Sequence, residues 1–346
     1  MPVLAAHIGS SEISFLYFSS PLNYKFFGMP YIYSSNIYGN YLDRNSFYDK
    51  VFQHAVKTHR LPSKDLEILV CSYPEDHCDI SNSHCITLDK ALNSINGYKY
   101  VYVDRHKVIE SGVPIERSLL PDTSDDSRED IARSEEANFL ANLTIYPFVK
   151  PINSAEQLDF DNATRSQLNG LVLDPEIPVV FTGDRFNAAT ERWDLAYLLM
   201  LDLISNAGFF ELYLDAANRV APLALLNSYN SALFDSIKDV NYKPLGTLLN
   251  VPGGVECLFE TELGTSQLVD IGSNDLFLFP LEVGAQARVL IKSDVMGTLD
   301  RFVIGGELGF VIDTRLKQSY ASFIENYSEK ELRLFEHVIS SRVGDL

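Results

Sequence analysis

The segment VLAAHIGSSEISFLYF, residues 3–18, decides how the rest of the chain is interpreted. A mostly apolar run leads into the turn Gly9-Ser10-Ser11, and apolar residues then alternate with others, so the segment predicts a β-hairpin. The chain continues with a predicted strand at 29–34, a helix at 46–59 and a buried strand at 66–71. This order of three strands, a helix and a strand is typical of an α/β or α+β protein.

The middle of the chain continues the alternation of strands and helices. Strands are predicted at 99–103, 107–109, 177–181 and 210–214, and helices at 89–96, 193–205, 222–227 and 231–237. From 255 to 314, short alternating strands separated by glycine turns predict a separate all-β module. Ser328 and Glu331 form a capping box that predicts a closing helix over 328–342.

The charge of the chain excludes several functions. Its 346 residues include 28 Lys and Arg against 47 Asp and Glu, which gives a formal net charge of −19. A nucleic-acid binder, or a protein that docks on anionic lipid, needs a basic face. The sequence has neither an apolar run of the ~18 residues that a membrane helix needs nor a signal peptide's basic start. We therefore expect a cytoplasmic protein that has no membrane span and binds no nucleic acid.

Three turns at strand ends carry the candidate site. They are His7-Ile8-Gly9-Ser10-Ser11 on the first hairpin, residues 103–107 on a later hairpin, and residues 179–184 after a buried strand. Glycine at such a turn lets backbone N–H groups approach phosphate oxygens, because no Cβ stands in the way. The ordered trio resembles the actin-like nucleotide-binding fold, in which two hairpin turns hold phosphate and a later Thr-Gly-Gly turn meets the adenosine.

That resemblance implies which residues would contact a nucleotide. ATP with magnesium would lie against Gly9, Ser10, Ser11, Asp104, Thr182 and Gly183. In this fold Mg²⁺ is usually held through water, and no direct protein ligand to a metal is predicted.

A more specific resemblance covers about residues 177–315. It is carried by the turn at 179–184, the helix at 198–204, the strand Leu212-Tyr213-Leu214-Asp215, and the run GGELGFVIDTR at 305–315. These stretches resemble the glutamate mutase accessory (MutL-type) family of actin-like proteins. The first half of the chain is similar in element order to the pilus-assembly actin-like scaffolds as well.

The resemblance implies an α/β fold of the actin-like, duplicated ribonuclease H-like class. It has two lobes, a C-terminal all-β module and a closing helix. The corresponding divisions are a first lobe at 1–98, a second lobe at 99–250, a β-rich module at 251–318 and a C-terminal helix at 319–346.

The chain departs from the actin-like pattern at all three turns. His7 stands where an aspartate is expected, Arg105 and His106 replace glycines after Asp104, and Asp184 replaces the second glycine of Thr-Gly-Gly. A neutral imidazole does not organise hydrated Mg²⁺ as a carboxylate does. The alternative is that His7, at a strand end, is simply a hydrogen-bonded core histidine. The other side chains obstruct the approach of a nucleotide to the backbone.

These departures predict a non-hydrolysing pseudo-ATPase that serves as a scaffold or adaptor for other proteins. Its cofactor would be none, or ATP with magnesium. The alternative is an ATP-dependent chaperone or reactivating factor for a cofactor enzyme, which would then be an ATPase. Self-assembly stays open, because filament formation is a habit of the fold.

Cysteines and histidines cluster between residues 71 and 85. Cys71, Cys78 and Cys85 recur every seven residues, with His77 and His84 before the last two. Free thiols are expected, because no export signal is present. Zinc binding and a disulfide within the loop are the alternatives, although the close Cys pairs of structural zinc sites are absent.

Several acids and tyrosines complete the candidates. Asp202 and Asp215 are interpreted as a helix-face acid and a strand-end acid, and Asp313 with Arg315 as a strand-end salt bridge of little energy if exposed. A tyrosine-rich stretch, which would suit a protein-contact surface or the edge of a core, comprises Tyr24, Tyr31, Tyr33, Tyr38, Tyr41 and Tyr48.

Overall fold

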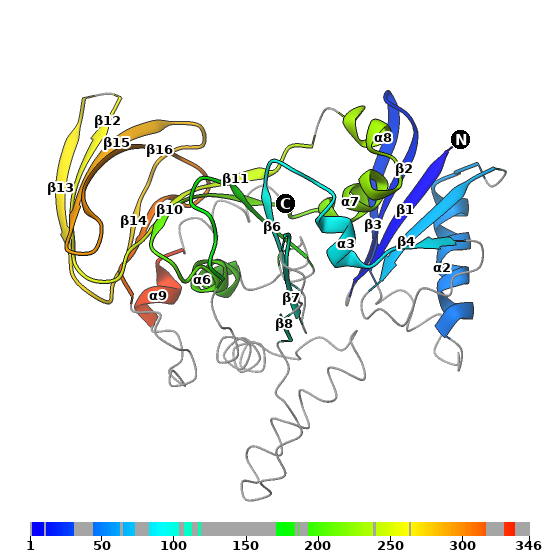
Figure 1. The fold of residues 1–346 in the computed structure, drawn as a ribbon, viewed down its shortest axis with the longest axis horizontal. Helices are drawn as coiled ribbons and strands as arrows, with labels where there is room; N and C mark the ends of the chain where they lie inside the picture. Colours follow the sequence, from blue (N-terminus) through cyan, green and yellow to red (C-terminus); the bar gives the residue numbers. More distant parts are fainter. Residues whose placement is uncertain are drawn as a thin grey trace, which may run out of the picture.

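The computed structural model describes residues 2–9, 12–30, 44–62, 65–72, 83–103, 107–112, 117–118, 171–183, 186, 193–237, 240–262, 264–315 and 329–335. The strands of the described residues form three β-sheets (Figure 1). No helix among the described residues is long and apolar enough to cross a membrane.

The first sheet has five strands in the order β3-β2-β1-β4-β5. They are β1 (Val3–Ile8), β2 (Glu12–Ser20), β3 (Asn23–Pro30), β4 (Glu67–Ser72) and β5 (Ser83–Cys85). Strands β1, β2 and β3 form an antiparallel meander, whereas β4 and β5 run parallel to β1. Strand β1 is buried on both faces, which explains its nearly continuous apolar sequence.

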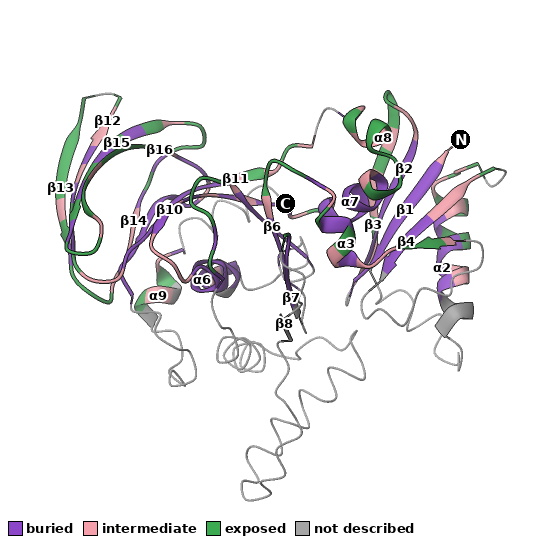
Figure 2. Cartoon of the chain, viewed as in Figure 1, coloured by how far each residue is buried: buried purple, intermediate pink, exposed green. Residues whose placement is uncertain are grey.

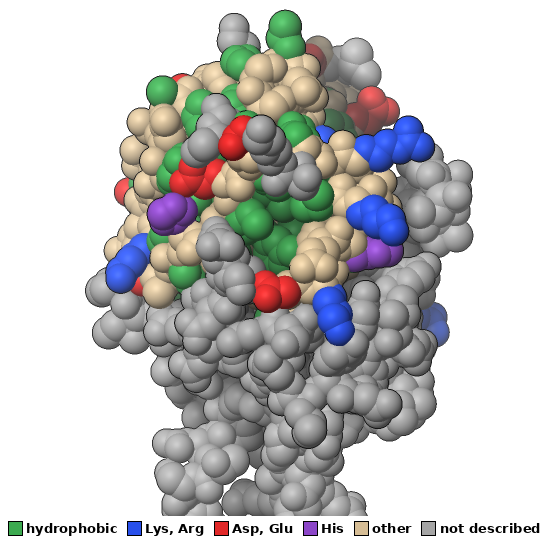
Figure 3. Space-filling view, turned by 90° about the vertical axis from the view of Figure 1, so that its right-hand side faces the viewer, with side chains coloured by type: hydrophobic (Ala, Val, Ile, Leu, Met, Phe, Trp, Pro, Cys, Tyr) green, Lys and Arg blue, Asp and Glu red, His purple; other side chains and the backbone are tan. Residues whose placement is uncertain are grey.

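Each face of the first sheet has its own core. Leu4, Ala6 and Ile8 point to a cluster that includes Val51, Phe52 and Ala55 of helix α2 (Arg44–Thr58). Some apolar residues of this cluster are only partly buried, namely Phe27, Met29, Val56, Leu61, Leu66 and Ile68. Figure 3, which views the side of the molecule with α2 and β4, shows apolar side chains in the middle of this face with charged ones around them.

The second sheet has eight strands in the order β14-β17-β11-β10-β9-β6-β7-β8. They are β6 (Lys99–Val103), β7 (Lys107–Glu110), β8 (Arg117–Ser118), β9 (Val179–Thr182), β10 (Gly208–Leu214), β11 (Lys243–Asn250), β14 (Leu276–Phe279) and β17 (Gly309–Asp313). Helix α6 (Trp193–Leu203) packs on one face of this sheet in the largest core cluster.

The strand order of the first sheet is repeated inside the second. Strands β8-β7-β6-β9-β10 reproduce the order β3-β2-β1-β4-β5, and in each set only the second strand, β2 or β7, runs against the others. Two copies of one five-stranded arrangement are what the duplicated actin-like fold requires. The predicted α/β actin-like class therefore agrees with the topology.

Helix α7 (Val220–Tyr229) joins the two copies. It follows β10 of the second sheet but packs against β1, β2 and β4 of the first, and it contacts helix α3 (Leu88–Leu92). Both helices lie between the two sheets (Figure 1). The core cluster around α7 takes residues from both sheets, so the two copies share one hydrophobic core.

The third sheet is antiparallel, with the strand order β13-β12-β15-β16. Its strands are β12 (Val255–Thr261), β13 (Ser266–Ile271), β15 (Gln286–Ser293) and β16 (Gly297–Ile304). One face packs on the β11, β14 and β17 side of the second sheet. The sequence placed all strands between 255 and 314 in one separate module, but β14 and β17 belong to the second sheet.

Candidate functional site

Asn218 links the first sheet to the second at the start of α7. Its side-chain Nδ2 donates to Glu12 Oε1 of β2 at 2.6 Å, and its Oδ1 accepts from the Gly183 N–H at 3.1 Å. Asn218 has a φ of 49°, a left-handed conformation that asparagine tolerates better than most residues. One buried amide therefore connects the first hairpin to the turn after β9.

Asp215 closes the same junction from the end of β10. Its Oδ2 accepts hydrogen bonds from Thr182 Oγ1 at 2.9 Å and from the Val220 N–H at 2.7 Å. Burial raises the pKa of the Asp215 carboxyl, and hydrogen bonds from the backbone of Val220 and Arg219 and from Thr182 oppose that rise. Asp215 thus serves as a buried acceptor for the first turn of α7, which agrees with its interpretation as a strand-end acid.

Gly183 can only be glycine in this structure. Its φ is +108°, and a Cβ would collide with the backbone carbonyl oxygen of Val103 in the neighbouring strand β6. The close approach of the two backbones leaves the Gly183 N–H directed at Asn218.

His7 lies on the face of β1 that points toward the second sheet. Its ring is fully buried and meets the edge of Tyr102 of β6, with centroids 5.2 Å apart and planes at 82°. Burial lowers the pKa of His7 to about 3, so the imidazole is neutral near pH 7. Among the described residues, neither ring nitrogen has a hydrogen-bond partner, and the same holds for Ser14 Oγ on the paired position of β2. His7 is thus a core histidine, but not a hydrogen-bonded one within that part of the chain.

We tested whether this junction fits the magnesium nucleotide that the fold implies. The described residues contain no group of three His, Cys, Asp or Glu side chains that could ligate a metal ion directly, but a Mg²⁺ ion held through water needs no such group. At the position expected of the metal-organising carboxylate stands the buried neutral His7. The His7 position therefore does not fit hydrated Mg²⁺, which prefers a carboxylate.

The predicted nucleotide contacts that the structure describes are Gly9, Thr182 and Gly183. The Gly9 N–H donates to the Glu12 carbonyl at 3.0 Å and closes the first hairpin. The Thr182 hydroxyl donates to Asp215, and the Gly183 N–H donates to Asn218. All three donors are therefore engaged inside the protein. Ser10, Ser11 and Asp104 lie outside the described residues, as do Arg105, His106 and Asp184.

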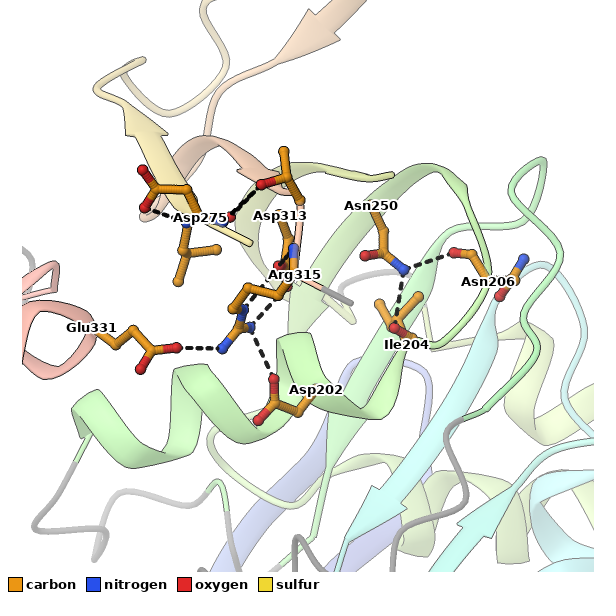
Figure 4. A network of polar contacts seen from close by, with 10 residues as sticks. Asp202, Ile204, Asn206, Asn250, Asp275, Asp313, Arg315 and Glu331 are labelled. Carbon is orange, nitrogen blue, oxygen red and sulfur yellow. Dashed lines mark hydrogen bonds and ion pairs between the residues drawn. The ribbon is translucent and has the colours of Figure 1, made fainter. Parts of the chain in front are cut away.

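A second polar cluster surrounds Arg315. The sequence predicted only its pair with Asp313. The guanidinium reaches Asp313 at 2.8 Å, Asp202 of α6 at 2.9 Å and Glu331 of helix α9 (Glu329–Arg333) at 2.9 Å (Figure 4). Burial alone would lower the pKa of Arg315, but Asp202 and Asp313 outweigh burial and raise it. The predicted salt bridge between Asp313 and Arg315 is confirmed, and it belongs to a buried network that fastens α9 to the second sheet.

The cysteines and histidines do not form a metal site in the described part of the chain. Cys71 is buried with its pKa raised by burial, whereas Cys85 is in a disulfide bond. His84 pairs with Glu67 at 3.1 Å. Cys78 and His77 lie outside the described residues. The expectation of free thiols is thus wrong for Cys85, and the disulfide alternative accounts for it.

The tyrosine-rich stretch falls mostly outside the described residues. Tyr24 is partly buried against the shared core, and Tyr48 is buried on α2. Both therefore agree with the core-edge interpretation. The other four members of the stretch lie in the part of the chain that the structure does not describe.

Comparisons with known proteins return distant likenesses. No known family matches the sequence, and no curated protein matches it. The structure is similar to the activator of the 2-hydroxyisocaproyl-CoA dehydratase from Clostridium difficile with bound ADPNP, at 10% identity and a TM-score of 0.40, over 70% of this chain and 100% of that one. It is also similar to component A of the Acidaminococcus fermentans (R)-2-hydroxyglutaryl-CoA dehydratase, at 9% identity and a TM-score of 0.38, over 67% and 99%.

A further similar structure is the ethanolamine utilization protein EutJ from Carboxydothermus hydrogenoformans. It has 11% identity and a TM-score of 0.31, over 64% of this chain and 88% of that one. At such values these likenesses carry no statement about activity, and the fold assignment rests on the duplicated strand order. The closer resemblance to the glutamate mutase accessory family stays a prediction.

Proposed function

We propose that this protein is a non-hydrolysing, actin-like pseudo-ATPase that works as a scaffold or adaptor for other proteins. The observation that carries the proposal is the buried contact between His7 and Tyr102. It occupies the position at which the actin-like resemblance expects a carboxylate for hydrated Mg²⁺.

The charge at this position supports the proposal. Phosphoryl transfer depends on positioning and on neutralisation of the phosphate charge, for which Mg²⁺ is the main agent. Because the pKa of His7 is about 3, its ring carries neither a negative charge for the cation nor a positive charge for the phosphates. A neutral ring packed on an aromatic edge supplies no carboxylate for the metal.

The connection between the two sheets also suits a scaffold. Asn218 bridges Glu12 and Gly183, and α7 buries apolar side chains against both sheets. A nucleotide-driven machine needs lobes that change their relative position, whereas a scaffold needs a fixed frame. The proposed frame consists of the lobes at 1–98 and 99–250, with the β-rich module at 251–318 and the helix segment at 319–346 attached.

The second candidate function is an ATP-dependent chaperone or reactivating factor. It is favoured by the retained Thr182-Gly183 turn at the end of β9, next to β6. Ser10, Ser11 and Asp104 would then contact ATP together with this turn. A cytoplasmic location and self-assembly are part of both candidates.

Thermal unfolding in the presence of ADPNP tests the choice. The full chain is heated with millimolar ADPNP, once with MgCl₂ and once with EDTA, and the dehydratase activator that was solved with ADPNP serves as the positive control. A ligand that binds only the native state at 100 times its Kd adds about 2.7 kcal/mol. We expect no magnesium-dependent rise in the midpoint for this chain. A magnesium-dependent rise would favour the reactivating factor.

A further inference from the structure

The third sheet has one buried face and one outward face. Along β15, Ala287, Val289 and Ile291 are buried in the core shared with the second sheet, whereas Arg288 and Lys292 are exposed on the other face. The sheet lies at the end of the molecule away from the first sheet (Figure 1), and β13 and β16 carry long exposed stretches (Figure 2).

Leucines from three neighbouring strands form a row across the outward face. Leu258 of β12 lies opposite Leu268 of β13 on one side and opposite Leu290 of β15 on the other. Leu268 is 63% exposed and Leu290 is 39% exposed. Phe302 of β16, diagonal to Leu290, is 72% exposed. We call Leu258, Leu268, Leu290 and Phe302 the outer apolar row.

Such a row is unusual for a sheet face that meets only water. An antiparallel sheet with one solvated face normally carries polar residues there. Isolated exposed apolar residues are common, but apolar residues that are contiguous and surrounded by charges mark interaction surfaces. The register pairs make this row contiguous across four strands.

The charges around the row indicate the kind of partner. The outward face carries four acids, Glu256, Glu260, Asp270 and Asp300, against two bases, Arg288 and Lys292. Arg288 already pairs with Asp300 at 2.5 Å and with Glu260 at 3.6 Å.

One pair of these acids is electrostatically unfavourable in the free protein. Glu256 and Asp270 lie directly opposite each other on adjacent strands, where like charges destabilise a sheet. Lys292 of β15 lies opposite Glu256 on the side away from Asp270. Because β13 is an edge strand, Asp270 faces no basic residue within this sheet, and the excess negative charge lies at its position. A cationic side chain from a partner would relieve this repulsion.

A second copy of the chain fits this face poorly. Each copy carries a formal net charge of −19 and would bring the same acidic surround to the contact. Like-charge juxtaposition across an interface disfavours association.

We propose that the outer apolar row is a docking surface for a protein segment with large apolar side chains flanked by Lys or Arg. This inference rests on the proposed scaffold function and names the surface and the chemistry of its partner. The apolar side chains would cover the row, and the basic ones would meet the acids beside it.

A random peptide library selected on the immobilised full chain provides the probe. We expect the enriched peptides to combine Leu, Ile, Phe or Trp with Lys or Arg, and to bind more weakly as salt is raised. Enrichment of acidic peptides, or no enrichment, would overturn the proposal.

Two variants test the surface with the enriched peptide as a fluorescent ligand. Leu290→Ser and Phe302→Ser should each weaken binding at least about tenfold, the scale of a residue central to an interface. Val172→Ser, at a position 73% exposed outside the third sheet, is the matched control and should bind as the wild type does. Unchanged binding by both Leu290→Ser and Phe302→Ser, with wild-type melting curves, would refute the surface.

Sedimentation of the free chain distinguishes the competing occupant. A dimer that Leu290→Ser disperses would assign the row to a second copy and overturn the proposal. Failure of the docking-surface proposal can be distinguished from failure of the proposed function. Magnesium-dependent nucleotide binding would contradict the pseudo-ATPase, whereas unchanged peptide binding by both variants contradicts only the docking surface.

Discussion

Replacing Asn218 by alanine should destabilise the protein strongly, because this amide joins the two sheets. Asn218→Ala removes a charge-assisted hydrogen bond to Glu12, worth about 1.5–3 kcal/mol, and a hydrogen bond to the Gly183 N–H, worth about 1 kcal/mol. Alanine at a φ of 49° adds about 1 kcal/mol of backbone strain. The free energy of unfolding should therefore fall by about 3.5–5 kcal/mol.

Urea unfolding followed by far-UV circular dichroism measures this change. Asn218→Gly separates the two causes, because glycine loses the hydrogen bonds without the strain and should be destabilised less. Asn230→Ala is the matched control, because Asn230 caps the short helix α8 (Ser231–Asp235) through two hydrogen bonds. This substitution should lower the free energy of unfolding by about 1 kcal/mol. If Asn218→Ala and Asn230→Ala lose the same free energy, the account of the junction is refuted.

Three further changes test the buried groups. Arg315→Met removes the cation that pairs with two buried aspartates, so it should lower the free energy of unfolding by about 3–5 kcal/mol. Urea unfolding measures this loss, and a loss below about 1 kcal/mol would contradict the network. Gly183→Ala should lower the melting temperature because its Cβ meets the Val103 carbonyl, and an unchanged melting temperature would contradict this contact. The wild type should lose about 2 kcal/mol through His7 between pH 6.5 and 5, because the unfolded chain protonates His7 near 6.5 and the folded chain only near 3. His7→Phe should remove this part of the pH dependence, and an identical pH profile in the variant would argue against a buried neutral ring.

Several elements of both copies were predictable, because each has a local signal. The sequence predicted the hairpin of β1 and β2, the strands β6 and β7, and the helix α6 close to their observed bounds. The strand predicted at 29–34 was misplaced, since β3 spans Asn23–Pro30, and β5 was not predicted. Strand β11 was missed, since Pro244 and Gly246 interrupt its apolar pattern. The structure requires Gly246, because a Cβ there would collide with the Gly309 carbonyl of β17. No local sequence pattern predicts this contact between distant residues.

The partners of strands and charges were not predictable from spacing. Alternating residues indicate a strand but not the sheet it joins, so β14 and β17 were grouped with the third sheet. Asp202 reaches Arg315 across more than a hundred residues, and only the packing of α6 against β17 brings them together.

The candidate site was predicted in part. The sequence singled out His7 as the departure that removes the metal-organising carboxylate, and Gly183 as part of the turn after β9. Both lie between the two sheets. Asn218 was overlooked, although an asparagine in the turn between β10 and α7 is a signal for a left-handed residue. The role of Asn218 depends on its hydrogen bond to Glu12, which lies 206 residues earlier in the chain. A contact over such a separation cannot be predicted from local sequence.

Hydrolysis of radiolabelled ATP by an excess of the full chain tests the central claim most directly, because one turnover suffices for detection. The account predicts that phosphate release in millimolar MgCl₂ equals release in EDTA and in buffer without protein, since the neutral His7 cannot organise the metal. Magnesium-dependent release above the buffer blank would contradict the pseudo-ATPase and identify the chain as a working actin-like ATPase.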